Sequence, residues 1–392
     1  MLNGKKILIG IGGGIAVYRV AELARLLIKA GADVRCVMTK SACEFVTPLT
    51  FEALTGNEVH TELFDLTAER NMGHIQLARW ADAVLIAPAT ANTLARLAYG
   101  IADDLLTTMM QVNEAPVLLA PAMNTSMWES AATRRNVEML IDGGYHFIGP
   151  ESGELACGEN GSGRLSEPES ICHALLPLIT DQSLTGKRWV INAGPTVEAW
   201  DPVRLLSNRA TGKLGALLAS AAAVMGADVT LIAGAGTPAA HPLVRRIDVE
   251  SADEMLTASI SAAKSADAFI ATAAVSDYRF NETYSEKLKR GDLTSLSVGL
   301  AANPDIVASV AAMDHRPKKV IAFAAESSDH IEHAKAKLER KGVDAIIAND
   351  ISNMGSDSAH GWWITADREV AIDTGSKKAF AEEIIQQIME LT

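Results

Sequence analysis

The chain has 392 residues, of which 48% are hydrophobic and 5% aromatic, a globular composition and a length that favours two domains over one. Its formal net charge of −13 argues against sequence-independent nucleic-acid binding, which requires a basic face. The N-terminal residues do not have the pattern of a signal peptide, and no apolar run reaches membrane-span length. We therefore expect a cytoplasmic protein that binds neither nucleic acid nor membrane.

The first half alternates apolar runs with helical patterns. Buried strands are predicted at 5–13, 32–39, 82–90 and 116–123. Between the first two, apolar residues follow the spacing of one helix face, at Val20, Leu23, Ala24, Leu27 and Ile28. Continuous apolar strands separated by amphipathic helices indicate a parallel sheet covered on both faces.

The alternation stops at a helix over 168–179 and restarts after a polar stretch at about 180–187. Further strands are predicted at 188–194, 228–234, 267–275, 318–326 and 344–350, followed by a hairpin at 362–373 and a helix at 378–391. The predicted fold class is α/β, with two doubly wound, mostly parallel three-layer domains of the flavodoxin-like or Rossmann-like kind, at 1–183 and 184–392. Ligands of such sheets bind beyond the carboxyl ends of the strands.

The first strand-end loop reads GIGGGIAVYR, but a dinucleotide fingerprint would need glycine where Ile15 stands. Its free backbone amides at a helix start suit a phosphate or a flavin edge, and a plain tight turn is an equal alternative. Later loops carry His74, Thr90, Asn92 and Asn124. Each has a simpler interpretation, as a surface or packing histidine, a helix cap or a turn residue.

Cys157 lies in the loop ELACGENGSGRL, among glycines and acidic residues where no core could form. The other cysteines are Cys36, Cys43 and Cys172, and no CxxC or zinc-type spacing joins any of the four. This spacing weakens a metal site, and the expected reducing compartment weakens a disulfide. The remaining interpretation is a reactive thiol on a loop made mobile by Gly153, Gly158, Gly161 and Gly163, and spacing alone does not decide in its favour.

In order, the segments GGGIAVYR, GHIQLA, PATANT, PAMNTSMW and ACGENGSGRL resemble the flavin-dependent cysteine decarboxylase family over residues 1–180. The resemblance implies a trimer-based assembly and FMN bound by Gly13, Gly14, Ile15, Thr39, Thr90 and Asn92. It also implies an active-site histidine at His74, a substrate-carboxylate ligand at Asn124 and a proton donor at Cys157. The chain departs from the family pattern at Gly14, often serine, and at Gly73, often acidic or polar.

The second half has the segment SNRATGKLG, which is not a P-loop because Ser207 and Leu214 stand where glycine and Ser or Thr are required. Lys213 is most simply a solvated loop residue. Lys287, Lys337 and Lys341 stand out in an acidic chain because a polyphosphate needs neutralising, although Lys337 and Lys341 also suit a solvated helix face.

Residues 187–392 resemble the phosphopantothenate–cysteine ligase family. The resemblance implies a dimeric domain that uses 4′-phosphopantothenate, L-cysteine and CTP, with Mg²⁺ held mainly by the phosphates. The implied CTP-binding residues are Ala274, Asp277, Lys287, Pro304, Asp305, Ile306, Val307, Phe323, Lys337 and Lys341. Asn208 would hold an acyl-cytidylate, with Arg204 nearby, and Lys287 would also be catalytic. Ala210 and Thr211 depart from the commoner family pattern.

Two other functions remain to be weighed. A flavin-binding scaffold would not need His74, Asn124 and Cys157 together, and a nicotinamide-dependent reductase would need the dinucleotide loop that Ile15 interrupts. A fused decarboxylase and ligase that passes its product from the second domain to the first is the favoured interpretation. Trimeric first domains joined to dimeric second domains are compatible with a homo-oligomer as large as a dodecamer.

Overall fold

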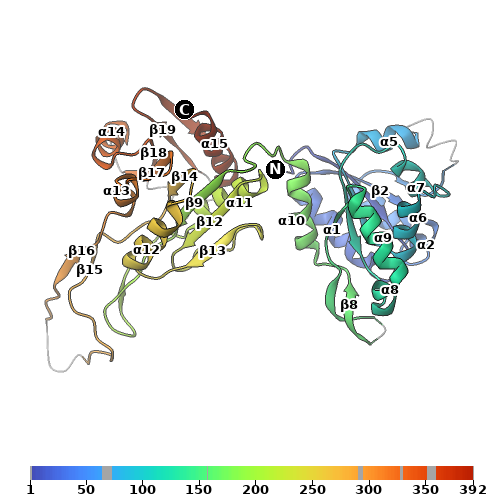
Figure 1. Ribbon diagram of the computed structural model, residues 1–392, viewed down its shortest axis with the longest axis horizontal. Helices are drawn as coiled ribbons and strands as arrows, with labels where there is room; N and C mark the ends of the chain where they lie inside the picture. The colour runs from blue at the N-terminus through green and yellow to red at the C-terminus, as the bar shows by residue number, and fades with distance from the viewer. Residues whose placement is uncertain are drawn as a thin grey trace. The chain divides into compact units, whose positions relative to one another are not determined.

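The computed structural model describes residues 2–63, 73–156, 158–289, 295–326, 330–350 and 359–391. It divides into two compact units, Met1–Asp181 and Gln182–Thr392. Each unit is a mostly parallel sheet with helices on both faces, so the predicted fold class is confirmed (Figure 1).

The sheet of the first unit has six parallel strands in the order β3-β2-β1-β4-β5-β6. The four predicted strands are β1 (Lys6–Ile11), β2 (Asp33–Met38), β4 (Ala83–Ala89) and β5 (Val117–Pro121). The edge strands β3 (Val59–His60) and β6 (His146–Phe147) have two residues each, too short for a sequence pattern.

Two apolar cores cover the two faces of this sheet. One contains Ile7 and Ile9 with α1 (Val17–Lys29), α2 (Lys40–Cys43), α3 (Pro48–Thr55) and α10 (Pro168–Ile179). The other contains Leu8 with α5 (His74–Trp80), α6 (Ala91–Tyr99), α7 (Leu105–Met110) and α9 (Ala131–Asp142). The alternation of strand side chains between faces fixes the register of β1. Helix α1 buries the predicted face, with Ile28 only partly covered.

A hairpin of β7 (Glu151–Glu154) and β8 (Asn160–Arg164) follows the first sheet, where the sequence suggested only a glycine-rich loop. Two of its glycines serve close packing, which corrects the expectation that they give mobility. A methyl group on Gly161 would lie 2.4 Å from Thr125 Oγ1, and one on Gly163 would lie 2.1 Å from the carbonyl oxygen of Met123. The hairpin is therefore docked on the segment before α8 (Thr125–Glu129).

The sheet of the second unit has eight strands in the order β13-β12-β9-β14-β17-β18-β19-β20. Its parallel strands are β9 (Arg188–Ala193), β12 (Asp228–Ala233), β13 (Arg245–Asp248), β14 (Ala268–Ala271), β17 (Lys319–Glu326) and β18 (Ala345–Asp350). The antiparallel pair β19 (His360–Ile364) and β20 (Glu369–Asp373) is the predicted closing hairpin. The sequence correctly predicts all of these strands except β13.

Helices α11 (Lys213–Val224) and α15 (Lys377–Glu390) pack together, while α12 (Ala252–Ala263), α13 (Ile306–Ala311) and α14 (His330–Lys341) share a separate core. Two short antiparallel ribbons were not predicted. They are β10 (Glu198–Ala199) with β11 (Leu205–Leu206), and β15 (Tyr278–Phe280) with β16 (Leu300–Ala302), which projects away from the second sheet (Figure 1).

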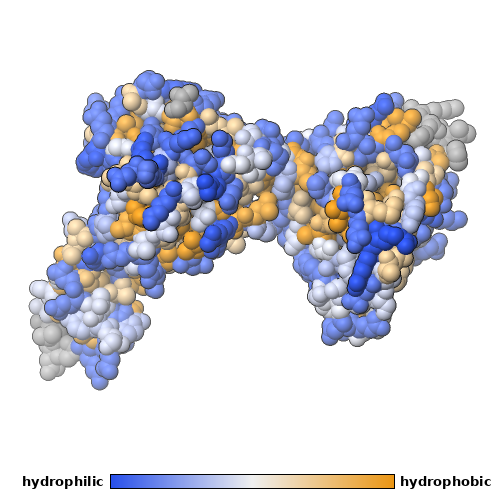
Figure 2. Space-filling model, viewed as in Figure 1, coloured by the Kyte–Doolittle hydropathy of each residue, from blue (hydrophilic) through white to orange (hydrophobic). Residues whose placement is uncertain are grey.

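Hydrophilic residues predominate on the visible surface of each unit, and in the second unit they gather around α13 and α14 (Figure 2). Within the described ranges, no helix has the length and apolar character needed to cross a membrane.

Replacing Gly163 by alanine should displace the hairpin. Gly163 has φ +152°, which L-residues rarely adopt, and the new methyl group would collide with Met123. We expect a loss of about 2–4 kcal/mol in the free energy of unfolding of the first unit, measured calorimetrically on the full chain.

The matched control is Gly56→Ala. Gly56 also has a positive φ, +69°, but a methyl group there would meet no heavy atom within 4 Å. Its cost should be about 1 kcal/mol, from backbone conformation alone. Equal losses in the two variants would contradict the close packing of the hairpin.

Candidate active sites

In the first unit, the chain winds outward from β1 to β2 and β3, then returns to β4 on the other side of β1. The loops after β1 and β4 therefore diverge at the carboxyl edge of the sheet, where doubly wound folds bind ligands. Gly13, Gly14 and Ile15 lie in the first of these loops, and Thr90 and Asn92 begin the helix after the second.

The loop after β1 lies close to its neighbours. A methyl group on Gly12 would lie 2.3 Å from the carbonyl oxygen of Pro88, and one on Gly13 would lie 2.3 Å from Ser41 Cβ. The space beside Gly14 is more open, since its nearest contacts would be at 3.9 Å. Helix α1 follows without a side-chain cap, and Ile15 is 59% exposed. Uncapped amides beside an exposed apolar residue suit the edge of a flavin with its phosphate.

The predicted threonines hold this edge together. Thr39 follows β2, accepts a hydrogen bond from the amide of Ala42 and donates one to the carbonyl of Ile11. Thr90 accepts a hydrogen bond from the amide of Thr93 as the cap of α6. Both therefore act as caps, the simpler interpretation, at the edge where the resemblance places FMN.

Asn124 lies at the end of β5 and caps α8, accepting a hydrogen bond from the amide of Ser126. Its Nδ2 donates a 2.6 Å hydrogen bond to a carboxylate oxygen of Glu159, on the hairpin. The Asn124 amide thus already binds one carboxylate within the protein. His74 is the first residue of α5. Cys157, between β7 and β8, lies outside the described residues.

The base of the hairpin is tied to α1 by charge. Glu167 binds Arg19 of α1 and accepts a 2.6 Å hydrogen bond from Arg164 of β8. The hydrogen bond from Arg19 lowers the pKa of Glu167, which stays ionised at neutral pH. The hairpin and the helix that follows the first loop are therefore held in one geometry.

The other cysteines of the first unit lack the lowered pKa that makes a thiol reactive. Cys36, Cys43 and Cys172 are free thiols. Burial raises the pKa of Cys36 and of Cys172 to about 12 and raises that of Cys43 as well. These thiols remain protonated at neutral pH.

In the second unit, the winding reverses beside β9 in the same way, between β9 and β14. A cavity of about 790 Å³ opens beyond these strand ends. It brings together nine of the ten predicted CTP-binding residues, together with Asn208: Ala274, Asp277, Pro304, Asp305, Ile306, Val307, Phe323, Lys337 and Lys341. The nine come from four separate stretches of sequence, and Asn208 comes from a fifth.

Hydrogen bonds fix the walls of this cavity. Asn208 Nδ2 donates to the carbonyl of Ala274, and its Oδ1 accepts a 3.0 Å hydrogen bond from the amide of Ala210. Lys341 Nζ forms an ion pair with Asp305 at 3.0 Å. Asp305 also caps α13 by accepting a hydrogen bond from the amide of Ala308.

Several cavity residues were not identified from the sequence. Asn192 is almost fully buried and accepts a hydrogen bond from the amide of Ala273, holding the loop after β14. Lys213, which we expected to be merely solvated, is exposed but also lines the cavity, as do Arg209 and Lys377. Arg209 and Lys213 share the segment SNRATGKLG with Asn208, whereas Lys377 is brought into the set only by the three-dimensional order of the strands.

Arg204 and Lys287 do not line this cavity in the single chain. Arg204 pairs with Asp201 at 2.9 Å, donates to the carbonyl of Leu288 at 3.1 Å and lies over the ring of Trp200. It borders a different pocket, beside the β15–β16 ribbon. Lys287 is exposed on the segment next to Leu288.

Comparison with known proteins covers the whole chain. Residues 1–180 match the Flavoprotein family, and residues 184–391 match the DNA/pantothenate metabolism flavoprotein C-terminal domain. Coenzyme A biosynthesis bifunctional protein CoaBC of Vibrio parahaemolyticus serotype O3:K6 is 45% identical over 100% of this chain and 99% of its own length. The chain belongs to the CoaBC family. The CoaBC of Escherichia coli strain K12 is 42% identical over 99% of this chain and 97% of its own.

One solved structure is that of the C-terminal domain of a coenzyme A biosynthesis bifunctional protein CoaBC. Its sequence is 33% identical to this chain, and the TM-score is 0.46. The match covers 53% of this chain and 96% of the solved chain. As a CoaBC family member, the chain is a bifunctional protein of coenzyme A biosynthesis whose first half is of the flavoprotein type.

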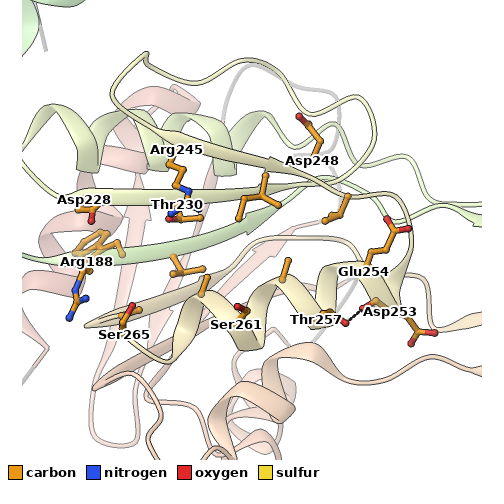
Figure 3. Close-up of a pocket in the computed structure, with 17 residues that line it drawn as sticks. Arg188, Asp228, Thr230, Arg245, Asp248, Asp253, Glu254, Thr257, Ser261 and Ser265 are labelled. Carbon is orange, nitrogen blue, oxygen red and sulfur yellow. Dashed lines mark hydrogen bonds between the residues drawn. The ribbon is translucent and has the colours of Figure 1, made fainter.

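A second groove of this CoaBC-family chain, about 940 Å³, lies over β9, β12 and β13 beside α12 (Figure 3). Arg188 and Asp228 lie at one end of it, and Asp253 and Glu254 at the other. Among the described residues, its charged lining is four acidic side chains and two basic ones, whereas that of the cavity beyond β9 is five basic and two acidic. A polyphosphate therefore favours the cavity beyond β9. Within the described ranges, no group of three or more His, Cys, Asp or Glu side chains could hold a metal ion.

Acid should release the segment that carries Lys287. The buried Asp201 carboxylate accepts hydrogen bonds from the amides of Val203, Arg204 and Leu288. Burial alone would raise the pKa of Asp201, but these amides and Arg204 outweigh it, so the net pKa lies below its usual 3.8. The ionised Asp201 carboxylate stabilises this segment fully at pH values above the pKa that Asp201 has in the unfolded chain. This stabilisation is lost as the pH falls through the lower pKa that Asp201 has in the folded chain.

We expect amide-exchange protection around residues 281–289, corrected for intrinsic rates, to fall in an acid-dependent step below about pH 4. Asp201→Asn should reduce protection at neutral pH and abolish the step, because asparagine cannot ionise. Persistence of the same step in that variant would assign it to another group.

Proposed function

We propose that the chain catalyses two consecutive steps. The second unit couples L-cysteine to 4′-phosphopantothenate using CTP, releasing pyrophosphate and CMP. The first unit converts the product to 4′-phosphopantetheine and CO₂ with the help of FMN. The observation that carries the proposal is the cavity beyond β9 and β14, which gathers Asn208 and nine residues that the ligase resemblance implies for CTP.

The ligase step depends on charge neutralisation. The substrate carboxylate attacks the α-phosphate of CTP, pyrophosphate leaves, and the cysteine amine then displaces CMP from the mixed anhydride. Lys337 and Lys341 project from α14 into a cavity with an excess of basic side chains, which suits a triphosphate. Mg²⁺ would be held mainly by the phosphates of CTP.

Asn208 is suited to hold the acyl-cytidylate because its loop is fixed to the carbonyl of Ala274 at the cavity wall. Lys287 and Arg204 lie outside that cavity, on a segment anchored by Asp201. We infer that Lys287 reaches the nucleotide of the neighbouring subunit in a dimer of second units.

In the decarboxylase step, FMN would accept and return the hydride that lets the cysteine carboxylate leave as CO₂. The amides of the loop at Gly13, Gly14 and Ile15 would bind it. Asn124 would hold the substrate carboxylate, and its hydrogen bond to the Glu159 carboxylate supports that role. His74 would lie in the same site, and Cys157, between the strands of the docked hairpin, would deliver the proton that completes the product.

Assembly would complete both sites. Ile15, Tyr18, Phe45 and Leu49 are all large, apolar and at least half exposed near the carboxyl edge of the first sheet, which supports burial in a trimer of first units. Such trimers, linked through dimers of second units, are compatible with a closed assembly as large as a dodecamer. The enzyme would act in the cytoplasm, with its cysteines reduced.

Purified protein incubated with 4′-phosphopantothenate, cysteine, CTP and Mg²⁺ should release CMP and CO₂ in equal amounts and show a flavin absorption spectrum. CMP without CO₂ would leave a ligase with a silent first unit. Formation of neither would refute the proposal.

Two variants should separate the steps. Asn208→Ala should lower CMP formation at least tenfold, through loss of hydrogen bonds to a charged intermediate, while CO₂ release from supplied phosphopantothenoylcysteine continues. Cys157→Ser should form CMP, bind FMN and release CO₂, but accumulate the oxidised, unreduced product, detected by mass spectrometry. Normal 4′-phosphopantetheine output from Cys157→Ser would exclude that cysteine as the proton donor.

A further inference from the structure

Lys377, far along the chain from every residue considered so far for CTP, lines the same cavity. Strand β19 runs antiparallel to β18, and β20 antiparallel to β19, so β20 ends at the carboxyl edge of the parallel strands. Helix α15 follows, with Ser376 as its cap and Lys377 as its first residue. Helix α11 packs on α15 and begins with Lys213, which also lines the cavity.

The position of Lys377 is unfavourable for a lysine in two respects. Its side chain is 8% exposed, whereas lysine is among the residues least often buried. It also lies in the first turn of a 14-residue helix, where the helix dipole disfavours a positive charge. An anionic ligand in the cavity would interact favourably with a cation held at this position.

The surrounding charge points in the same direction. Among the described residues, the cavity is lined by Arg209, Lys213, Lys337, Lys341 and Lys377 against Asp277 and Asp305. Asp305 is already paired with Lys341 at 3.0 Å. In a chain with a net charge of −13, this concentration of basic groups marks an anion site.

We propose that Lys377 is a further phosphate ligand of the ligase site, donating a hydrogen bond from Nζ to a phosphoryl oxygen of a bound substrate. The inference rests on the proposed function and extends it to a residue on the terminal helix. Two substrates carry phosphoryl groups, CTP and 4′-phosphopantothenate. Separate binding measurements with each one identify the source.

The test compares Lys377→Met with Lys378→Met by calorimetric titration of the full chain. Lys378 is the adjacent lysine of the same helix turn, but it is exposed and does not line the cavity. Titrants are CTP, CMP, 4′-phosphopantothenate and inorganic pyrophosphate. Loss of a charge-assisted hydrogen bond should weaken binding of one phosphorylated substrate roughly tenfold to a hundredfold in Lys377→Met, and Lys378→Met should bind as the wild type does.

Thermal unfolding separates ligand binding from a structural role. In Lys377→Met, the increase in melting temperature produced by CTP or 4′-phosphopantothenate should become smaller than in the wild type, whatever the melting temperature of the ligand-free chain. Lys377→Arg should recover part of the lost affinity. A greater loss for CTP than for CMP would assign Lys377 to the β- or γ-phosphate.

Unchanged affinity for both substrates in Lys377→Met would overturn the inference, as would a wild type that binds none of the four titrants. A lowered melting temperature without ligand, with a normal ligand response, would also overturn it, because it would indicate a structural role. A wild type that forms no CMP, yet binds pyrophosphate in a Lys377-dependent manner, would refute the proposed reaction and support the phosphate site.

Discussion

The constraint on which both sites depend is the reversal of winding beside the central strand of each sheet. At β1 and at β9, successive connections leave in opposite directions, so two strand-end loops diverge instead of closing over one another. Backbone amides and side chains can then face a ligand without losing the packing of the strands below. The buried cores on both faces of each sheet hold this edge rigid.

Long parallel strands were predictable because both of their faces are buried, which leaves continuous apolar runs in the sequence. The hairpin β7–β8 was not, because its segments are polar and glycine-rich and no face of it enters a core. Gly163 shows the limit clearly. A sequence shows a glycine, but whether it serves mobility or close approach depends on Met123, which is 40 residues away in the chain.

The candidate sites divide in a similar way. Asn208, Asp305 and Lys337 could be proposed from the sequence because the ordered segments that carry them resemble those of the phosphopantothenate–cysteine ligase family. Lys377 could not be included, since its place at the cavity follows from the direction of β20 and not from any motif. Lys287 shows the opposite case, in which a residue prominent in the sequence lies outside the cavity of the single chain.

One topology thus supports two kinds of recognition that differ in their donors. The edge of the first sheet uses close-packed glycines, threonine caps and backbone amides, which suit a flat, largely apolar ring that carries one phosphate. The edge of the second presents lysines from α11, α14 and α15, which suit a ligand that concentrates several negative charges in a small volume. The groove beside α12 has neither glycine loops nor a basic excess among its described lining residues. The sign of the lining charge therefore distinguishes the two cavities of the second unit.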